Sequence, residues 1–268
     1  MIYFPPCKIN LGLHILKKRD DGFHEIESGM LEIPFHDVLE VIPADQFSFQ
    51  STGMEIPGDG NLCTEAFRLL QSEFGLPEVA IHLHKVIPMG GGLGGGSSDA
   101  AKTLVALRDL FKLELSDGQL ESYAAKLGSD CPFFIRGGLQ LATGRGELLQ
   151  SLPLQLPQFH VVLVNLGIHV PTKDAYTLVV PEPHRKSLKE LLALPVADWK
   201  NELVNDFEKS VFTQHPVLAD VKKELYEAGA VYAAMSGSGS TLFGLFEEKR
   251  EISWLKQPVY EVWTELER

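Results

Sequence analysis

The chain has 268 residues, of which 44% are hydrophobic and 22% are charged, and its formal net charge is −12. These values are ordinary for a globular protein with one large domain or two smaller ones. The strong acidic balance argues against general binding to nucleic acid or to anionic membranes. An anionic substrate would therefore have to meet positive charge that is concentrated locally.

Neither a targeting signal nor a membrane-spanning stretch is evident, because no apolar run is long enough. The three cysteines, Cys7, Cys63 and Cys131, are far apart and form no Cys-x-x-Cys pair. We therefore expect reduced thiols in a cytoplasmic protein, and neither a disulfide framework nor a zinc site.

The first half of the chain predicts a mixture of strands and helices. The expected elements are strands at residues 8–16, 29–42 and 79–87 and a helix at 61–74. A charged turn, residues 17–22, joins the first two strands, Asn61 is the expected helix cap, and Pro88 ends the third strand.

The second half continues in irregular order. The expected helices are 116–127, with Ser116 as its cap, 188–192, 199–205 and 217–227. The expected strands are 132–135, 139–142, 160–166, 233–235 and 241–246. The proline-containing segment 151–158 is the best domain boundary, and the irregular mixture favours an α+β fold over a doubly wound parallel sheet.

The most informative feature is a glycine-rich segment, Pro88 to Ala101, in which six of seven positions from 90 to 96 are glycine. Glycine loses more backbone freedom on folding than any other residue, so such a cluster needs a compensating interaction. The segment lies between an expected strand and an expected helix, with Ser97 or Ser98 as the helix cap. Backbone N–H groups at such a helix start can hold a phosphate.

Three other interpretations of this segment are weaker. A flexible linker is not expected here, because the sequence on both sides of the segment has the pattern of ordered elements. A P-loop would need a lysine before Ser97, and none is present. Gly90, Gly92 and Gly95 match the G-x-G-x-x-G spacing of dinucleotide sites, but Asp109 then lies inside a helical run and not at a strand end. A nucleotide phosphate site without a lysine remains the best interpretation.

Several polar residues elsewhere are candidates for chemistry. Lys8, Asn10 and Gly12 share one strand face, which could equally be a solvated sheet surface. Phe23 and His24 lie in a turn that could recognise a planar ring or simply bury one. Asp130, between a helix end and an apolar segment, could accept a proton or could cap a helix.

Two smaller features leave their interpretation open. The glycine-serine run 236–240 could approach a phosphate or turn a hairpin. His82 and His84 share a strand face, but no third ligand is evident, so a metal site is not expected there.

Together these segments resemble the GHMP small-molecule kinases, whose three motifs occur here in order. They are Pro6-x-Lys8-Ile9-Asn10-Leu11, the glycine segment, and Met235 to Ser240. Within that superfamily the sequence is most similar to the 4-diphosphocytidyl-2-C-methyl-D-erythritol kinases of the non-mevalonate isoprenoid pathway. Asp21 to Glu25, Gly128 to Phe134 and Asn205 to Glu208 narrow the resemblance, which covers nearly the whole chain.

The resemblance implies a two-domain α+β fold with the active site in the interdomain cleft. It implies an N-terminal ATP-binding domain over residues 1–152 and a C-terminal domain over 153–268. It also implies phosphorylation of the substrate's 2-hydroxyl by ATP with Mg²⁺, which needs mainly positioning and charge neutralisation. The expected partner is a small molecule, with no nucleic acid and no membrane, and the protein is expected to be a monomer or weak homodimer.

The resemblance also assigns roles to residues. Asp130 would be the catalytic base and Lys8 its partner. The ATP-binding residues would be Asn61, Leu62, Lys85, Pro88, Gly90, Gly91, Gly92, Gly94, Gly95, Gly96, Ser97 and Ser98. The residues that hold the cytidyl substrate would be Asn10, Phe23, His24, Thr172, Tyr176, Gly237 and Gly239, with the cytosine between Phe23 and Tyr176. The magnesium ligands are unassigned, with Ser97, Ser98 and Asp99 as candidates.

Two departures from the family pattern concern this site. Phe23 stands where the family usually has tyrosine, and Cys7 stands where it usually has a small residue. The alternatives are another GHMP kinase of the mevalonate or homoserine type, a catalytically silent nucleotide-binding regulator, and a dinucleotide-dependent oxidoreductase.

Overall fold

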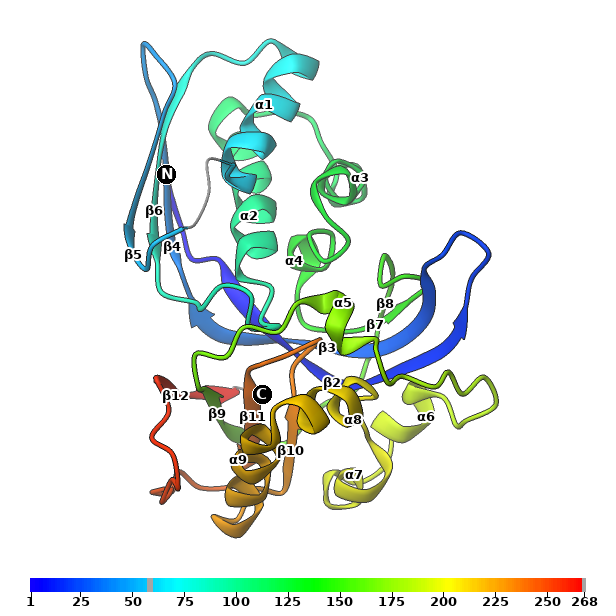
Figure 1. Ribbon diagram of the computed structural model, residues 1–268. Helices are drawn as coiled ribbons and strands as arrows, with labels where there is room; N and C mark the ends of the chain where they lie inside the picture. Colours follow the sequence, from blue (N-terminus) through cyan, green and yellow to red (C-terminus); the bar gives the residue numbers. More distant parts are fainter. Residues whose placement is uncertain (57–59, 267–268) are drawn as a thin grey trace. The chain divides into compact units, whose positions relative to one another are not determined.

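The computed structural model describes residues 1–56 and 60–266, and these form two compact units (Figure 1). Unit 1 comprises Met1–Cys7, Phe35–Met89 and Gly94–Gly137. Unit 2 comprises Lys8–Pro34, Gly90–Leu93 and the residues from Gly138 onward. This division into compact units differs from the expected division, which has a single boundary after residue 152. The glycine-rich segment contributes residues to both units.

Unit 1 is a four-stranded sheet covered by helices. Its strand order is β1 (Ile2–Tyr3), β4 (Val38–Pro43), β6 (Val79–Lys85) and β5 (Ser48–Gly53). Its helices are α1 (Leu62–Phe74), α2 (Gly95–Phe111), α3 (Asp117–Leu127) and α4 (Phe133–Arg136). Figure 1 shows α1 and α2 side by side against the sheet. Alternate residues of β6 (Val79, Ile81 and Leu83) are buried against α1 and α2, as the apolar alternation predicts.

Two expected helix caps in unit 1 are confirmed. Asn61 accepts a hydrogen bond from the N–H of Cys63, and Ser116 forms a capping box with Gln119. The expected cap at Ser97 or Ser98 is wrong, because α2 already begins at Gly95 with Gly94 as its N-cap. Glycine can adopt the left-handed conformation at Gly94 (φ 70°), so the helix starts inside the glycine segment.

The expected strand at residues 132–135 is also wrong, since this segment forms α4. Pro132 has helical dihedral angles and precedes the first turn, where a proline ring is well tolerated. A run of four mostly apolar residues does not distinguish a buried strand from a short buried helix.

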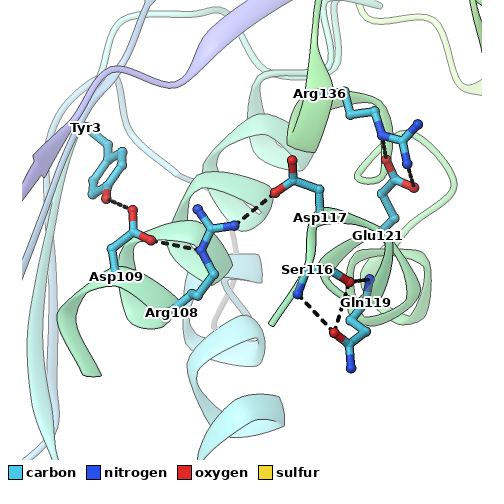
Figure 2. A network of polar contacts seen from close by, with 8 residues as sticks. All are labelled: Tyr3, Arg108, Asp109, Ser116, Asp117, Gln119, Glu121 and Arg136. Carbon is cyan, nitrogen blue, oxygen red and sulfur yellow. Dashed lines mark hydrogen bonds and ion pairs between the residues drawn. The ribbon is translucent and has the colours of Figure 1, made fainter. Parts of the chain in front are cut away.

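A network of hydrogen bonds and ion pairs links β1, α2 and α3 in unit 1. Figure 2 shows Asp109 of α2 accepting a hydrogen bond from the Tyr3 hydroxyl (2.5 Å) and pairing with Arg108, which also reaches Asp117 of α3 (2.9 Å). Burial and the bond to Asp109 raise the pKa of Tyr3 to about 12. Asp109 thus has a structural role, and the dinucleotide interpretation loses its ribose-binding acid.

Within the described residues, unit 2 contains two four-stranded sheets and five helices. The strand order of one sheet is β10 (Tyr232–Met235), β11 (Leu242–Phe246), β9 (Phe159–Asn165) and β12 (Tyr260–Leu266). The strand order of the other sheet is β2 (Pro6–Lys18), β3 (His24–His36), β7 (Leu139–Thr143) and β8 (Leu148–Ser151). The helices are α5 (Thr172–Ala175), α6 (Leu188–Leu192), α7 (Val196–Glu202), α8 (Phe207–Gln214) and α9 (Pro216–Glu227). The core lies between β9, β11 and α9, where Val162, Leu225 and Phe246 are buried.

The sequence predicted this half less completely. The helices at 188–192 and 217–227 are confirmed, whereas the helix expected at 199–205 lies at 196–202. Asn205 instead forms an isolated bridge with Leu13 of β2. In this half the helices α5 and α8 and the strands β8 and β12 were not expected, and in unit 1 the strands β1 and β5 were not expected either. Among the described residues, no helix has the length and apolar character that crossing a membrane requires.

Candidate functional site

The glycine-rich segment is held in a conformation that only glycine adopts easily. Gly90, Gly92 and Gly94 have φ values of 67°, 80° and 70°. A Cβ on Gly92 would lie 2.0 Å from the carbonyl oxygen of Ser236, and one on Gly91 would lie 2.6 Å from Thr241 Oγ1. These glycines are therefore required by the protein's own packing.

Gly96 differs from its neighbours. A Cβ on Gly95 would lie 2.9 Å from Lys85 Nζ and from Ile87 Cγ2. A Cβ on Gly96 would meet Leu62 Cδ1 at 3.9 Å, an ordinary van der Waals distance, and the residue lies inside a helix. Among the described residues, neither backbone strain nor a neighbouring atom explains a glycine at this position.

Gly96 borders a cavity of about 250 Å³ in unit 1. Its other lining residues are Ile56, Gly60, Asn61, Leu62, Lys85, Met89 and Asp99. The structure thus brings together four of the expected ATP-binding residues around one space. The first turn of α2 adds N–H groups without a helical acceptor, because the helix hydrogen bonds begin with Ser98 N to Gly94 O and no side chain in the described part of the chain caps the helix. Such a helix start favours an anion.

Lys85 is buried between two carboxylates. Its Nζ donates to Asp37 Oδ2 and to Asp99 Oδ2, the latter at 2.7 Å. Asp37 Oδ1 also accepts from the N–H groups of Val86 and Ile87. Burial is the main influence on Asp99 and raises its pKa to about 7. Because two carboxylates share one ammonium group, Lys85 supplies no net positive charge to the cavity.

Asp130 lies in the turn between α3 and α4 and is half-buried. The next residue, Cys131, is buried, and burial raises the pKa of its thiol to about 11, while the neighbouring Ser97 side chain lowers it. The Asp130 turn therefore lies close to the first turn of α2. Sequence spacing gave no signal for this contact.

In unit 2, Lys8 belongs to a buried polar cluster. Lys8 Nζ donates to Asn10 Oδ1 (2.5 Å), and Asn10 Nδ2 donates to Ser28 Oγ (2.8 Å). Lys8 and Asn10 are only 3% and 1% exposed, so the solvated sheet surface considered for this face is wrong. The backbone N–H of Lys8 also donates to the carbonyl of Leu93 in the glycine-rich segment (2.9 Å).

The glycine-serine run 236–240 turns the hairpin between β10 and β11 and contacts the glycine-rich segment. Ser236 Oγ donates to Gly92 O (2.8 Å), and Thr241 N donates to Gly91 O (3.2 Å). Asn205 Nδ2 donates to the carbonyls of Met235 and Gly237 (2.7 and 2.8 Å) and so fixes this turn. Asn205 and Ser236 appear in the quoted motifs, but the sequence assigned neither a role.

The residues expected at the cytidyl end are partly brought together. The His24 ring stacks on Tyr176 with 4.5 Å between centroids, and Tyr176 lies edge-on to Phe207. Thr172 Oγ1 lies 3.3 Å from the Ser238 hydroxyl. Phe23 is 54% exposed, and the Arg145 guanidinium lies 4.8 Å from its ring centroid. Burial lowers the pKa of His24, which favours a neutral imidazole.

The candidate metal ligands differ in their environments. Asp99 is bound to Lys85, and the Ser98 side chain is fully buried, whereas Ser97 is half-buried at the helix start. Within residues 1–56 and 60–266, no group of three or more His, Cys, Asp or Glu side chains could hold a metal ion. His82 and His84 share the Thr52 hydroxyl as a neighbour (3.1 and 3.0 Å).

Two family models match the chain: the GHMP kinases N terminal domain over residues 61–138 and the GHMP kinases C terminal domain over 185–263. The chain is 49% identical over 254 residues to a 4-diphosphocytidyl-2-C-methyl-D-erythritol kinase from Cytophaga hutchinsonii, with 94% of each chain covered. A crystal structure of a 4-(cytidine 5'-diphospho)-2C-methyl-D-erythritol kinase matches with a TM-score of 0.80 at 36% identity, covering 92% of this chain and 90% of that one. Mevalonate kinase from Methanococcus jannaschii shares the fold (TM-score 0.70, 12% identity, 92% and 90% covered).

Proposed function

The chain belongs to the GHMP kinase family of small-molecule kinases, and we propose that it transfers the γ-phosphoryl group of ATP to the 2-hydroxyl of 4-diphosphocytidyl-2-C-methyl-D-erythritol. The proposed binding of ATP rests on one observation, the cavity beside Gly96 at the uncapped start of α2. The acceptor substrate is supported by the names of relatives that match along nearly their whole length.

In this proposal the adenosine lies in the cavity lined by Asn61, Leu62 and Lys85. The phosphates lie against the N–H groups at the first turn of α2, where the helix dipole favours negative charge. Backbone donors are fixed before the substrate arrives, so they stabilise the transferred group without reorganisation. Gly96 keeps a side chain out of this path.

Asp130 and Lys8 are proposed to act at the acceptor hydroxyl. Asp130 accepts the proton of the 2-hydroxyl or orients that hydroxyl, and Lys8 stabilises the negative charge that develops on oxygen. This role requires a rigid cation, which agrees with the burial of Lys8 and its bond to Asn10. Asn10, Phe23, His24, Thr172, Tyr176, Gly237 and Gly239 are proposed to hold the cytidine diphosphate end.

A magnesium ion needs little from the protein here, because Mg²⁺ in kinase sites takes most of its ligands from phosphates and water. The Ser97 hydroxyl fits as a protein ligand, since it is half-buried at the helix start. Asp99 fits poorly because Lys85 already binds its carboxylate. When bound, the ion would neutralise charge on the phosphates.

Three coarser assignments complete the proposal. We place an ATP-binding domain over residues 1–152 and a second domain over 153–268. Cytoplasmic location is supported by three buried cysteines that form no disulfide, which suits a reducing compartment. The protein is proposed to act as a monomer or weak homodimer.

The experiment is an ADP-release assay with purified protein, ATP and Mg²⁺. The three acceptors compared are the cytidyl substrate, mevalonate and homoserine. We expect turnover only with the cytidyl substrate. Turnover restricted to mevalonate or homoserine would refute the proposed substrate, and ATP binding without turnover of any acceptor would favour a silent regulator.

A further inference from the structure

A chain of buried hydrogen bonds runs behind Lys8 and ends at a residue with no assigned role, Ser28 of β3. Ser28 Oγ lies 2.8 Å from Asn10 Nδ2 and 2.8 Å from the carbonyl oxygen of Gly12. Ser28 is fully buried, and Asn10 is 1% exposed. All these residues belong to unit 2.

The hydrogens of this chain can be arranged in only one way. The Gly12 carbonyl can only accept, so the single Ser28 hydroxyl hydrogen must go to it. Ser28 can then offer Asn10 only a lone pair, and the Asn10 group that faces it must be the amide NH₂. The amide oxygen consequently faces the other way.

The opposite end of Asn10 requires the same orientation. Lys8 Nζ has three donor hydrogens and no lone pair when charged, so it must face an acceptor, which is Asn10 Oδ1 at 2.5 Å. Ser236, whose hydroxyl donates to Gly92 O at 2.8 Å, lies 3.3 Å from the same oxygen. Asn10 thus fixes the Lys8 ammonium through its oxygen and is itself fixed by Ser28 through its nitrogen.

We propose that Ser28 is a positioning residue for phosphoryl transfer, acting through Asn10 on the Lys8 ammonium. The proposal rests on the proposed function only in taking Lys8 as the catalytic cation. Lysine side chains have several rotatable bonds, so a cation that must stay at one point needs a rigid acceptor. A buried amide gives that rigidity only when both of its ends are bound.

The arrangement also limits the expected role of Asn10 in substrate binding. One of its two amide hydrogens is used by Ser28, and its oxygen is used by Lys8. At most one amide hydrogen is left for the cytidyl substrate. The main effect of Asn10 should therefore fall on kcat and less on the KM for that substrate.

A double-mutant cycle tests the proposal. In the Ser28→Ala variant the Asn10 amide loses its acceptor, and we expect kcat to fall about tenfold, the rate equivalent of one hydrogen bond, with little change in the KM for ATP. In an Asn10→Ala background, Ser28→Ala should lower kcat no further. The Ser28→Thr variant, which keeps the hydroxyl, should retain most of the wild-type kcat.

The bond from Ser28 to Gly12 provides an internal control, because it does not involve Asn10. Its loss should lower the melting temperature in both backgrounds, and by less in the Asn10→Ala background, where Ser28→Ala leaves no amide without its acceptor. An equal fold loss of kcat in the two backgrounds would overturn the proposal. So would a wild-type kcat in the Ser28→Ala variant.

A second measurement needs no turnover and so separates this inference from the proposed substrate. The chain has five asparagines, so ¹⁵N-asparagine labelling gives few side-chain amide signals, and the Asn10 signal is identified by its loss in Asn10→Ala. We expect slow solvent exchange of the Asn10 amide in the wild type and at least tenfold faster exchange in Ser28→Ala. Unchanged exchange would refute the role of Ser28 even if the cytidyl substrate proves wrong.

Discussion

Replacing Gly96 by alanine should weaken ATP binding without weakening the fold. Gly96 is the second residue of α2 and borders the 250 Å³ cavity that we assign to the nucleotide. The added methyl group would meet Leu62 Cδ1 at 3.9 Å, so the protein itself accommodates it. As far as the described residues show, the methyl group takes only space in front of the cavity.

The expected magnitudes follow from these contacts. Alanine is favoured over glycine in helices by up to about 1 kcal/mol, so the melting temperature should stay the same or rise by about 2 °C. Overpacking a fitted site by one methyl group costs about 1–3 kcal/mol, which corresponds to a Kd for ATP that is about 5- to 150-fold higher. Calorimetric titration with a non-hydrolysable ATP analogue measures the second quantity, and thermal unfolding measures the first.

Gly118→Ala is the matched control. Gly118 is likewise the second residue of a helix in unit 1, and a Cβ there would have no heavy atom of a described residue within 4 Å. It should give the same gain in stability with no change in ATP affinity. Wild-type ATP affinity in the Gly96→Ala protein would refute the assignment of this cavity, and a clear loss of stability would refute the packing argument.

Three further predictions concern charged groups. Asp130→Asn should lower kcat by orders of magnitude while the Kd for ATP is unchanged, and a near-normal kcat would exclude Asp130 as the base. Lys85→Met leaves Asp37 and Asp99 buried without their cation and should lower the free energy of unfolding in urea by about 3–5 kcal/mol; a loss of ATP affinity with unchanged stability would contradict this. Burial, followed by Arg185, lowers the pKa of His14 from 6.5 to about 4, so the native state loses about 3 kcal/mol of stability as the pH falls from 6.5 to 4. His14→Phe should remove this loss, and urea unfolding at pH 7 and pH 4 that shows the same loss in both proteins would rule it out.

The parts of the fold that the sequence predicted well are those governed by local chemistry. Asn61 and Ser116 were identified as caps because a short polar side chain before a helix satisfies its first N–H groups. The strand at 79–85 follows from strict alternation of apolar residues. The glycine-rich segment predicted a helix directly after a strand, and α2 is that helix, although the serine cap expected for it is wrong.

The parts that failed depend on distant contacts. The start of α2 at Gly95 is set by a left-handed Gly94, whereas the serines that resemble caps lie already inside the helix. Ser28 gave no signal, because its role depends on a carbonyl of β2 and on an amide 18 residues away in sequence. The stacking of His24 on Tyr176 was not foreseen either. The proposed position of cytosine between Phe23 and Tyr176 requires that cytosine stack on the face of Tyr176 that His24 leaves open, or that it displace the His24 ring.

The acidic composition sharpens the question of how this chain attracts a nucleotide. Lys85 lies directly below the start of α2, as a Cβ on Gly95 would lie 2.9 Å from its ammonium group. However, Asp37 and Asp99 share that ammonium, so the cluster of three carries a net charge of −1 when all its members are ionised. A phosphate therefore gains nothing from Lys85 as a free charge. Within unit 1, we therefore expect the peptide dipoles of the first turn of α2 to supply the attraction, which requires a close approach of the phosphate to the backbone at Gly96.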